Sequence, residues 1–132
     1  MYDLTTKCNI IVKGFTYYSD NRCPALCRQY ESLDDLLTDI KQKTIDTRYV
    51  RIPQRDGAHD VKFARCFAGH LSFPVSDSSM GYIDEHITTI EADGKIIYSS
   101  GELHHDNGFI GTRSEALFDA ITTWTVQPDY AD

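Results

Sequence analysis

Residues 87–99, which read ITTIEADGKIIYS, place an Asp-Gly pair between two runs that are rich in β-branched and aromatic residues. A two-residue turn between antiparallel strands needs a positive φ at both central residues, and Asp-Gly provides it at low cost. The segment therefore predicts a β-hairpin, with strands over 87–92 and 95–99 and a turn at Asp93 and Gly94.

A first helix is predicted over residues 32–43. Ser32 is a good N-cap, and Asp34 and Asp35 put negative charge into the first turn, where the helix dipole favours it. Apolar residues then recur at helical spacing and form one stripe. These are Leu33, Leu36, Leu37 and Ile40.

A second helix is predicted after residue 112. Thr112 and Glu115 have the spacing of a capping box, in which each side chain satisfies a free backbone donor of the other residue. Apolar residues follow on one face, and Pro128 ends any continuation. We expect the tail, residues 126–132, to be flexible. The apolar face consists of Ala116, Leu117, Ala120, Ile121 and Trp124.

Three further segments have the composition of strands. They are residues 8–18, with a bend at Gly14, and the two arms of a predicted hairpin, 48–53 and 59–67. Residues 19–31, between the first strand and the first helix, are predicted to be a loop in which Pro24 opens a short helical turn. Residues 74–82 and 101–111 are also predicted to be loops, because small, polar and glycine residues dominate them.

The predicted order of elements is β-α-β-β-β-β-α. This order indicates an α+β fold, with a mainly antiparallel sheet of about five strands and two helices packed on one face. The length of 132 residues fits a single globular domain over residues 1–132. Hydrophobic residues make up 41% and charged residues 25% of the chain, which argues against wholesale disorder. No apolar run is long enough to span a membrane and no secretory signal is expected, so we expect a cytoplasmic protein.

The formal net charge of −7 is unevenly distributed along the chain. Residues 41–65 carry seven basic and three acidic side chains, whereas residues 66–132 carry two basic and eleven acidic ones. An acidic surface favours a protein partner with a basic surface and argues against direct binding of duplex nucleic acid, which needs a basic face. A solvated surface that only keeps the protein soluble is the alternative.

No metal and no cofactor are expected from the sequence. Without a secretory signal, the four cysteines are interpreted as thiols rather than disulfides. Cys23 and Cys27 have a spacing that zinc sites tolerate, but the adjacent His104 and His105 would point apart on an extended loop. No phosphate-binding loop, zinc-protease motif or nucleophile elbow occurs.

Two arginines carry an alternative hypothesis, a small-molecule or nucleotide-binding domain. Arg65 would share a strand face with Phe63 and Phe67, where an arginine either pairs with an internal carboxylate or faces an anionic ligand. Arg51 and Arg65 would together form an anion pocket. A second alternative is a hydrolase that uses His104, His105 and Asp106 in the loop before the last helix.

The leading hypothesis is a small acidic interaction protein, without enzymatic activity, that docks on a macromolecular partner and modulates or inhibits it. Inhibitors, immunity factors and anti-defence or accessory proteins of mobile elements share this compositional profile. Tyrosine is enriched at protein interfaces, and carboxylates would oppose basic groups on the partner. A homo-oligomer is also compatible with the sequence. The predicted partner-binding residues are Asp84, Glu85, Glu91, Asp93, Tyr82 and Tyr98.

Overall fold

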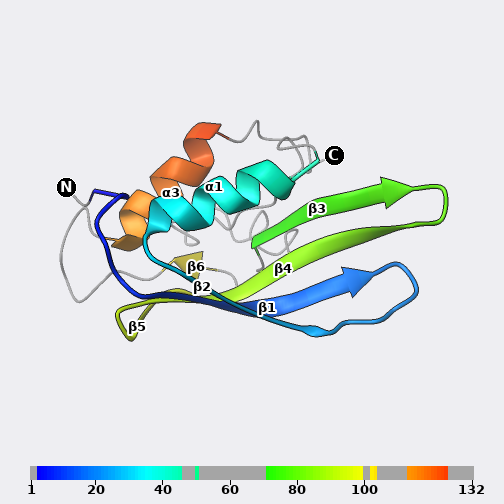
Figure 1. Cartoon of the computed structure of the whole chain (residues 1–132), viewed down its shortest axis with the longest axis horizontal. Helices are drawn as coiled ribbons and strands as arrows, with labels where there is room; N and C mark the ends of the chain where they lie inside the picture. The colour runs from blue at the N-terminus through cyan, green and yellow to red at the C-terminus, as the bar shows by residue number, and fades with distance from the viewer. Residues whose placement is uncertain (1–2, 46–49, 51–70, 100–101, 104–112, 125–132) are drawn as a thin grey trace.

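The computed structural model describes residues 3–45, 50, 71–99, 102–103 and 113–124. Within these residues it is an α+β fold, an antiparallel sheet with two helices on one of its faces (Figure 1), so the predicted fold class is confirmed. The predicted order β-α-β-β-β-β-α was wrong, because two strands rather than one precede the first helix. In chain order the elements are β1 (Ile10–Tyr18), β2 (Ala25–Tyr30), α1 (Leu33–Lys43), β3 (Leu71–Ser78), β4 (Gly81–Ala92), β5 (Lys95–Ser99), β6 (Glu102–Leu103) and α3 (Arg113–Trp124). None of the helices described is long and apolar enough to cross a membrane.

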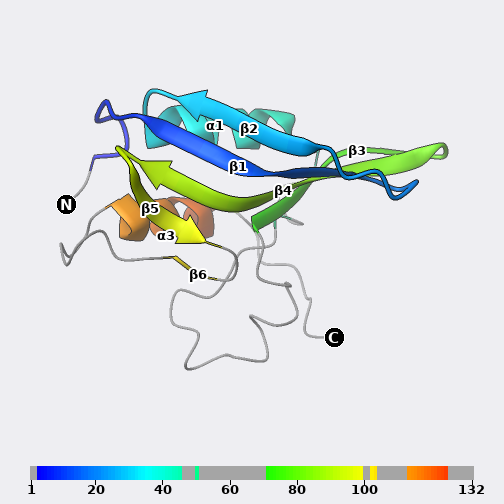
Figure 2. The same ribbon diagram turned by 90° about the horizontal axis from the view of Figure 1, so that it is seen from below.

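The 12-residue strand β4 is the centre of the sheet, whose order is β2-β1-β4-β5-β6. On one side β4 pairs with β1 along its length, from Ala92 opposite Ile10 to Ile83 opposite Tyr18. On its other side, residues 81–87 pair with β3 and residues 89–92 with β5. Two strands therefore share one edge of β4 end to end, and Figure 2 shows the sheet from the face that the helices leave open.

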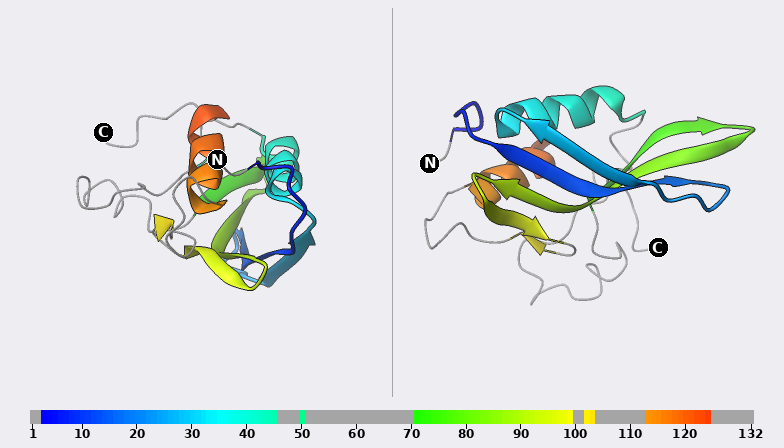
Figure 3. Two further views of the ribbon diagram at one scale, coloured as in Figure 1. Left: turned by 90° about the vertical axis from the view of Figure 1, so that its left-hand side faces the viewer. Right: turned by 60° about the horizontal axis from the view of Figure 1, so that its bottom comes forward.

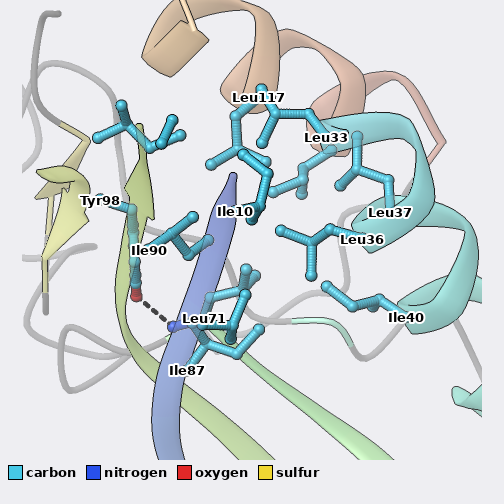
Figure 4. Packing of buried hydrophobic residues seen from close by; sticks show 14 of the residues in the cluster. Ile10, Leu33, Leu36, Leu37, Ile40, Leu71, Ile87, Ile90, Tyr98 and Leu117 are labelled. Atoms are coloured by element: carbon cyan, nitrogen blue, oxygen red, sulfur yellow. Dashed lines mark hydrogen bonds between the residues drawn. The ribbon is translucent and has the colours of Figure 1, made fainter. Parts of the chain in front are cut away.

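The side chain of Tyr98 joins these two strands where they meet. Tyr98 lies in β5 and is fully buried, and its hydroxyl accepts a hydrogen bond from the backbone N–H of Leu71, the first residue of β3 (Figure 4). This bond satisfies a buried backbone donor at a point where the ladder of the sheet changes partner.

Gly14 marks an irregularity between β1 and β4. Lys13 pairs with Thr89 but Gly14 pairs with Ile87, so one residue of β4 is left over at this point. A Cβ atom at position 14 would lie 1.9 Å from the carbonyl oxygen of His86, closer than any side chain permits. The register shift falls at the residue where a bend was predicted, and only glycine allows the two strands to approach there.

Helices α1 and α3 cover the same face of the curved sheet (Figure 3, left). Ser32 caps α1 as predicted, accepting a hydrogen bond from the backbone N–H of Asp35 at 3.1 Å. The predicted stripe of α1, Leu33, Leu36, Leu37 and Ile40, is buried against the sheet (Figure 4). Leu117 and Ile121 of α3 complete this core. Burial of this apolar surface holds the two layers together.

The turn between β4 and β5 is the one that the sequence predicts. Asp93 has φ of 52° and Gly94 has φ of 81°, the two positive values that a tight hairpin of this kind requires. Asp93 also accepts a hydrogen bond from the backbone N–H of Asn9 at 2.8 Å and one from Arg113 at 2.9 Å. The turn is therefore fastened both to the start of β1 and to α3.

Two predicted loops are largely strands instead, and the short strand β6 lies inside a third, residues 101–111. The prediction of a helical turn after Pro24 was wrong, because residues 25–30 pair with β1 in an unbroken register and the Pro24 carbonyl accepts the Thr16 N–H at 2.9 Å. Residues 74–82 were also predicted wrongly, since β3 continues through Pro74 to Ser78 and β4 begins at Gly81. In both cases pairing with a neighbouring strand overrides the local signals of proline and small polar residues. The hairpin predicted over 48–53 and 59–67 and the predicted tail lie outside the described residues, apart from Val50, which is buried.

The β1–β2 and β3–β4 hairpins both extend past the end of the helix layer (Figure 1; Figure 3, right). The two ends lie beside each other, because β1 and β4 remain paired as far as Tyr18 and Ile83. Their turns form the part of the described sheet that is farthest from the two helices.

Replacement of Tyr98 by phenylalanine should destabilise the fold, because the buried Leu71 N–H loses its acceptor. The expected loss in the free energy of unfolding is about 1–3 kcal/mol, measured by urea denaturation. Tyr18→Phe removes a hydroxyl from a half-buried tyrosine and should change the free energy of unfolding by less than about 0.5 kcal/mol. Equal losses for the two variants would contradict this role of Tyr98.

Candidate functional site at the hairpin ends

The ends of the two hairpins expose a group of large side chains. Met80 is 93% exposed and Tyr82 is 44% exposed, whereas nearly all other large apolar residues described are buried or half-buried. The Tyr17 ring lies 5.9 Å from the Tyr82 ring, between centroids, which brings the two hairpins into contact. We call this group, made up of Tyr17, Tyr18, Arg22, Met80 and Tyr82, the tip surface.

Backbone hydrogen bonds fix the two turns to one another. The Ser19 N–H donates to the Tyr82 carbonyl at 3.0 Å, and the Tyr82 N–H donates to the Ser19 hydroxyl at 3.2 Å. Between the turns lies a shallow hollow of about 260 Å³, whose walls include Tyr18, Met80 and Tyr82. The backbone that carries the tip surface is thus held in one arrangement by the chain itself.

Arg22 is the only basic residue of the tip surface, and its charge is already compensated. The guanidinium lies over the Tyr18 ring, 4.1 Å from its centroid, and its Nε donates to both carboxylate oxygens of Asp20 at 3.0 and 2.9 Å. This hydrogen bonding lowers the pKa of Asp20 below its ordinary value. Asp77, which pairs with Tyr82 across the β3–β4 hairpin, is exposed and adds a negative charge.

Aromatic side chains continue from the tip surface onto the open face of the sheet. The His86 ring stacks on Phe15, with centroids 4.7 Å apart and an angle of 7° between the planes. His86 Nδ1 is 2.8 Å from the Ser72 hydroxyl, and the Tyr17 ring meets His86 edge-on at 6.4 Å. Because alternate residues of a strand share a face, Tyr82, Asp84 and His86 all lie on this side.

A network of charged side chains lies on the face of the sheet that α1 covers, on the same side as Tyr18 and opposite to Tyr17 and Tyr82. Arg28 of β2 donates two hydrogen bonds to Glu85 of β4, each 2.6 Å long. The Glu85 side chain is only 8% exposed and that of Arg28 is 31% exposed. Hydrogen bonding to Glu85 raises the pKa of Arg28 further above its ordinary value. Lys43 of α1 reaches the same carboxylate, with its Nζ 3.6 Å from Oε1 of Glu85.

Tyr30 and Asp39 extend the network. The Tyr30 hydroxyl donates to Oδ2 of Asp39 at 2.5 Å, and Lys43 Nζ lies 3.0 Å from the same oxygen. Burial, and then the hydrogen bond to Asp39, raise the pKa of Tyr30 to about 12. Burial alone would raise the pKa of Asp39, but the hydrogen bond from Tyr30 and the contact with Lys43 bring it below its ordinary value.

The predicted partner-binding residues do not form one surface. Tyr98 and Glu85 were predicted to face a partner, and this placement is wrong, because one lies in the core and the other in the charge network. The Asp93 carboxylate is engaged by Asn9 and Arg113 within the chain. Glu91 lies near the opposite end of β4 from Tyr82. Tyr82 and the half-buried Asp84 are the members that the structure places beside the hairpin ends.

The residues of the two alternative hypotheses, Arg51, Arg65, His104, His105 and Asp106, lie outside the described residues, so both hypotheses remain predictions. Cys23 and Cys27 are exposed thiols, as expected, and Cys8 is a half-buried one. In the part of the chain that the structure describes, no three or more His, Cys, Asp or Glu side chains gather as a metal site would require. Comparison with protein-family models, curated proteins and solved structures found no match for this chain.

Sequence reasoning pointed to tyrosines as interface residues, but it missed Arg22 and Met80 of the tip surface and the whole charge network. Leu26, Arg28 and Tyr30 alternate along β2 and share the face towards α1. An arginine between two apolar residues at alternating positions is the signal that drew attention to Arg65, and it is present here as well. It went unused because residues 19–31 were predicted to be a loop.

The raised pKa of Tyr30 makes a pH-dependent contribution to stability. Its pKa in the folded protein, about 12, exceeds the ordinary value of 10.0, so this contribution is present below pH 10 and is lost as the pH rises towards 12. Urea denaturation across this range should show a steeper loss of stability in the wild type than in Tyr30→Phe. The matched variant Tyr18→Phe should retain the steeper loss. Identical curves for the wild type and Tyr30→Phe would contradict the assignment.

Proposed function

We propose that this protein is a small docking protein, without a catalytic role, that binds a basic surface of another protein through the tip surface. The observation that carries the proposal is the exposure of Met80 and Tyr82 at the ends of two hairpins that extend past the helices. Methionine and tyrosine are enriched at protein interfaces, where their burial provides much of the binding free energy.

The fixed geometry of the tip surface supports this role. Hydrogen bonds join the two turns, and Arg22 is held between the Tyr18 ring and the Asp20 carboxylate. A surface that is already ordered loses little conformational entropy when a partner binds. The shallow hollow between the turns offers room for a partner side chain.

The charges around the tip surface favour a basic partner. Arg22 is neutralised by Asp20, whereas the side chain of Asp77 is exposed. The chain as a whole carries a formal charge of −7. Opposite charge on the partner would accelerate association at low ionic strength, and the apolar contact of Met80 and Tyr82 would then hold the complex.

Site-specific photo-crosslinking tests the proposal. A photoreactive amino acid at position 80 should crosslink the full-length protein to a discrete partner in the cells that produce it. The same group at Thr38, which is exposed on α1, is the matched control and should not crosslink to that partner. Equal crosslinking from positions 80 and 38, or none from position 80, would contradict docking through the tip surface.

Binding constants with the partner recovered in this way give the second measurement. Tyr82→Ala should weaken Kd about tenfold or more, as expected for a central aromatic contact. Asp77→Lys should slow association at low salt, and the effect should fade as salt is added. An association rate that is unaffected by Asp77→Lys at low salt would contradict a basic partner.

A further inference from the structure

Strand β2 forms one end of the sheet in the described part of the chain. It pairs with β1 on one side and with no other described strand. The register runs without a shift from Tyr30 opposite Ile10 to Ala25 opposite Phe15. The pairing is therefore regular, and the outward backbone groups of an edge strand can pair with a further strand.

The ladder of β1 and β2 shows which backbone groups point outward. The Tyr18 N–H donates to Arg22 and the Thr16 N–H to Pro24, so the even-numbered residues of this arm bond to β1. Hydrogen bonding alternates along an antiparallel pair. The N–H and C=O groups of Ala25, Cys27 and Gln29 therefore point away from β1, and all three residues are exposed.

The side chains of β2 leave this edge uncovered. The Arg28 side chain reaches across the sheet to Glu85 of β4, and the Tyr30 side chain reaches Asp39 of α1. The side chain of Gln29 turns back to Asn9, with its Nε2 2.6 Å from Oδ1. No lysine and no proline occurs within Ala25–Tyr30 to discourage pairing.

The other described edges are protected. β3 contains Pro74, which has no N–H, and its register with β4 shifts between Pro74 and Ser76. The backbone of Ile45 also bonds to this strand, donating to the Pro74 carbonyl at 3.1 Å. At the opposite end of the sheet from β2, β6 has only two residues. Among the described edges, β2 is thus the one that is both long and unprotected.

We propose that this edge pairs with the β2 strand of a second copy of the chain, antiparallel and about a twofold axis at Cys27. In this register Cys27 faces Cys27 of the other copy and Ala25 faces Gln29, so no like charges meet. Glu31 of one copy, 79% exposed, lies across from Cys23 of the other and next to Arg22, 65% exposed. These charges are already paired within each copy, Glu31 with Lys7 and Arg22 with Asp20, so the register brings no unpaired charges of like sign together. The proposal rests on the backbone of β2 and not on the function proposed for the tip surface, with which it shares only Arg22 at its margin.

The first test is the oligomeric state of the full-length protein, measured by sedimentation over a concentration series. The wild type should form a dimer, and Cys27→Ser, which keeps the backbone N–H, should form it equally well. Cys27→Pro removes the N–H that points to the partner copy but none that bonds to β1. Two hydrogen bonds are lost per dimer, so the dissociation constant of the dimer should rise about thirtyfold.

Crosslinking with a short bifunctional maleimide tests the register, and does so even if Cys27→Pro fails to fold. A variant that keeps Cys27 as its single cysteine should crosslink rapidly. A matched variant that keeps only Cys23 should not, because in this register the two Cys23 residues are about eight residues, roughly 26 Å, apart.

Three results would overturn the proposal. They are a monomer at every concentration, a dimer that a folded Cys27→Pro variant forms with unchanged affinity, and crosslinking of Cys23 as fast as that of Cys27. If an unrelated extended peptide occupied the β2 edge instead, the protein would be a monomer at every concentration, which is the first of these results.

Discussion

The ion pair between Arg28 and Glu85 is the constraint on which the arrangement of the sheet depends. It joins β2 to β4 across the intervening strand β1, and the register places Gly14, which has no side chain, on the diagonal between them. A carboxylate as buried as Glu85 is tolerated only when it is paired and hydrogen-bonded. Lys43 brings α1 to the same carboxylate, so that one buried charge fixes two strands and a helix.

The position of this network explains the shape of the molecule. Lys43 is the last residue of α1, and beyond Glu85 towards the hairpin ends the sheet continues without helical cover (Figure 1). The hairpins are held firmly where they leave the helix layer, and the hydrogen bonds of Ser19 and Tyr82 join them again at their ends. An ordered, partly apolar surface can therefore project from a small domain although no helix packs on this part of the sheet.

The elements that could be predicted from the sequence are those whose signals are local. Ser32 and the apolar stripe define α1, and Asp93-Gly94 defines the β4–β5 turn, because capping and positive φ involve only neighbouring residues. β2 and the β3–β4 hairpin could not be recognised in the same way, because residues far along the chain stabilise them. The candidate site depends on such pairing, and Tyr82 alone of the tip surface was among the predicted partner-binding residues.

A double-mutant cycle on Arg28 and Glu85 tests the central claim most directly. Arg28→Met, Glu85→Gln and the double variant would be unfolded in urea, beside a control cycle on the exposed pair of Arg22 and Asp20. We expect a coupling energy of about 2 kcal/mol for the buried pair and a clearly smaller one for the exposed pair. Single effects of Arg28→Met and Glu85→Gln that simply add would contradict the claim that this ion pair holds the sheet together.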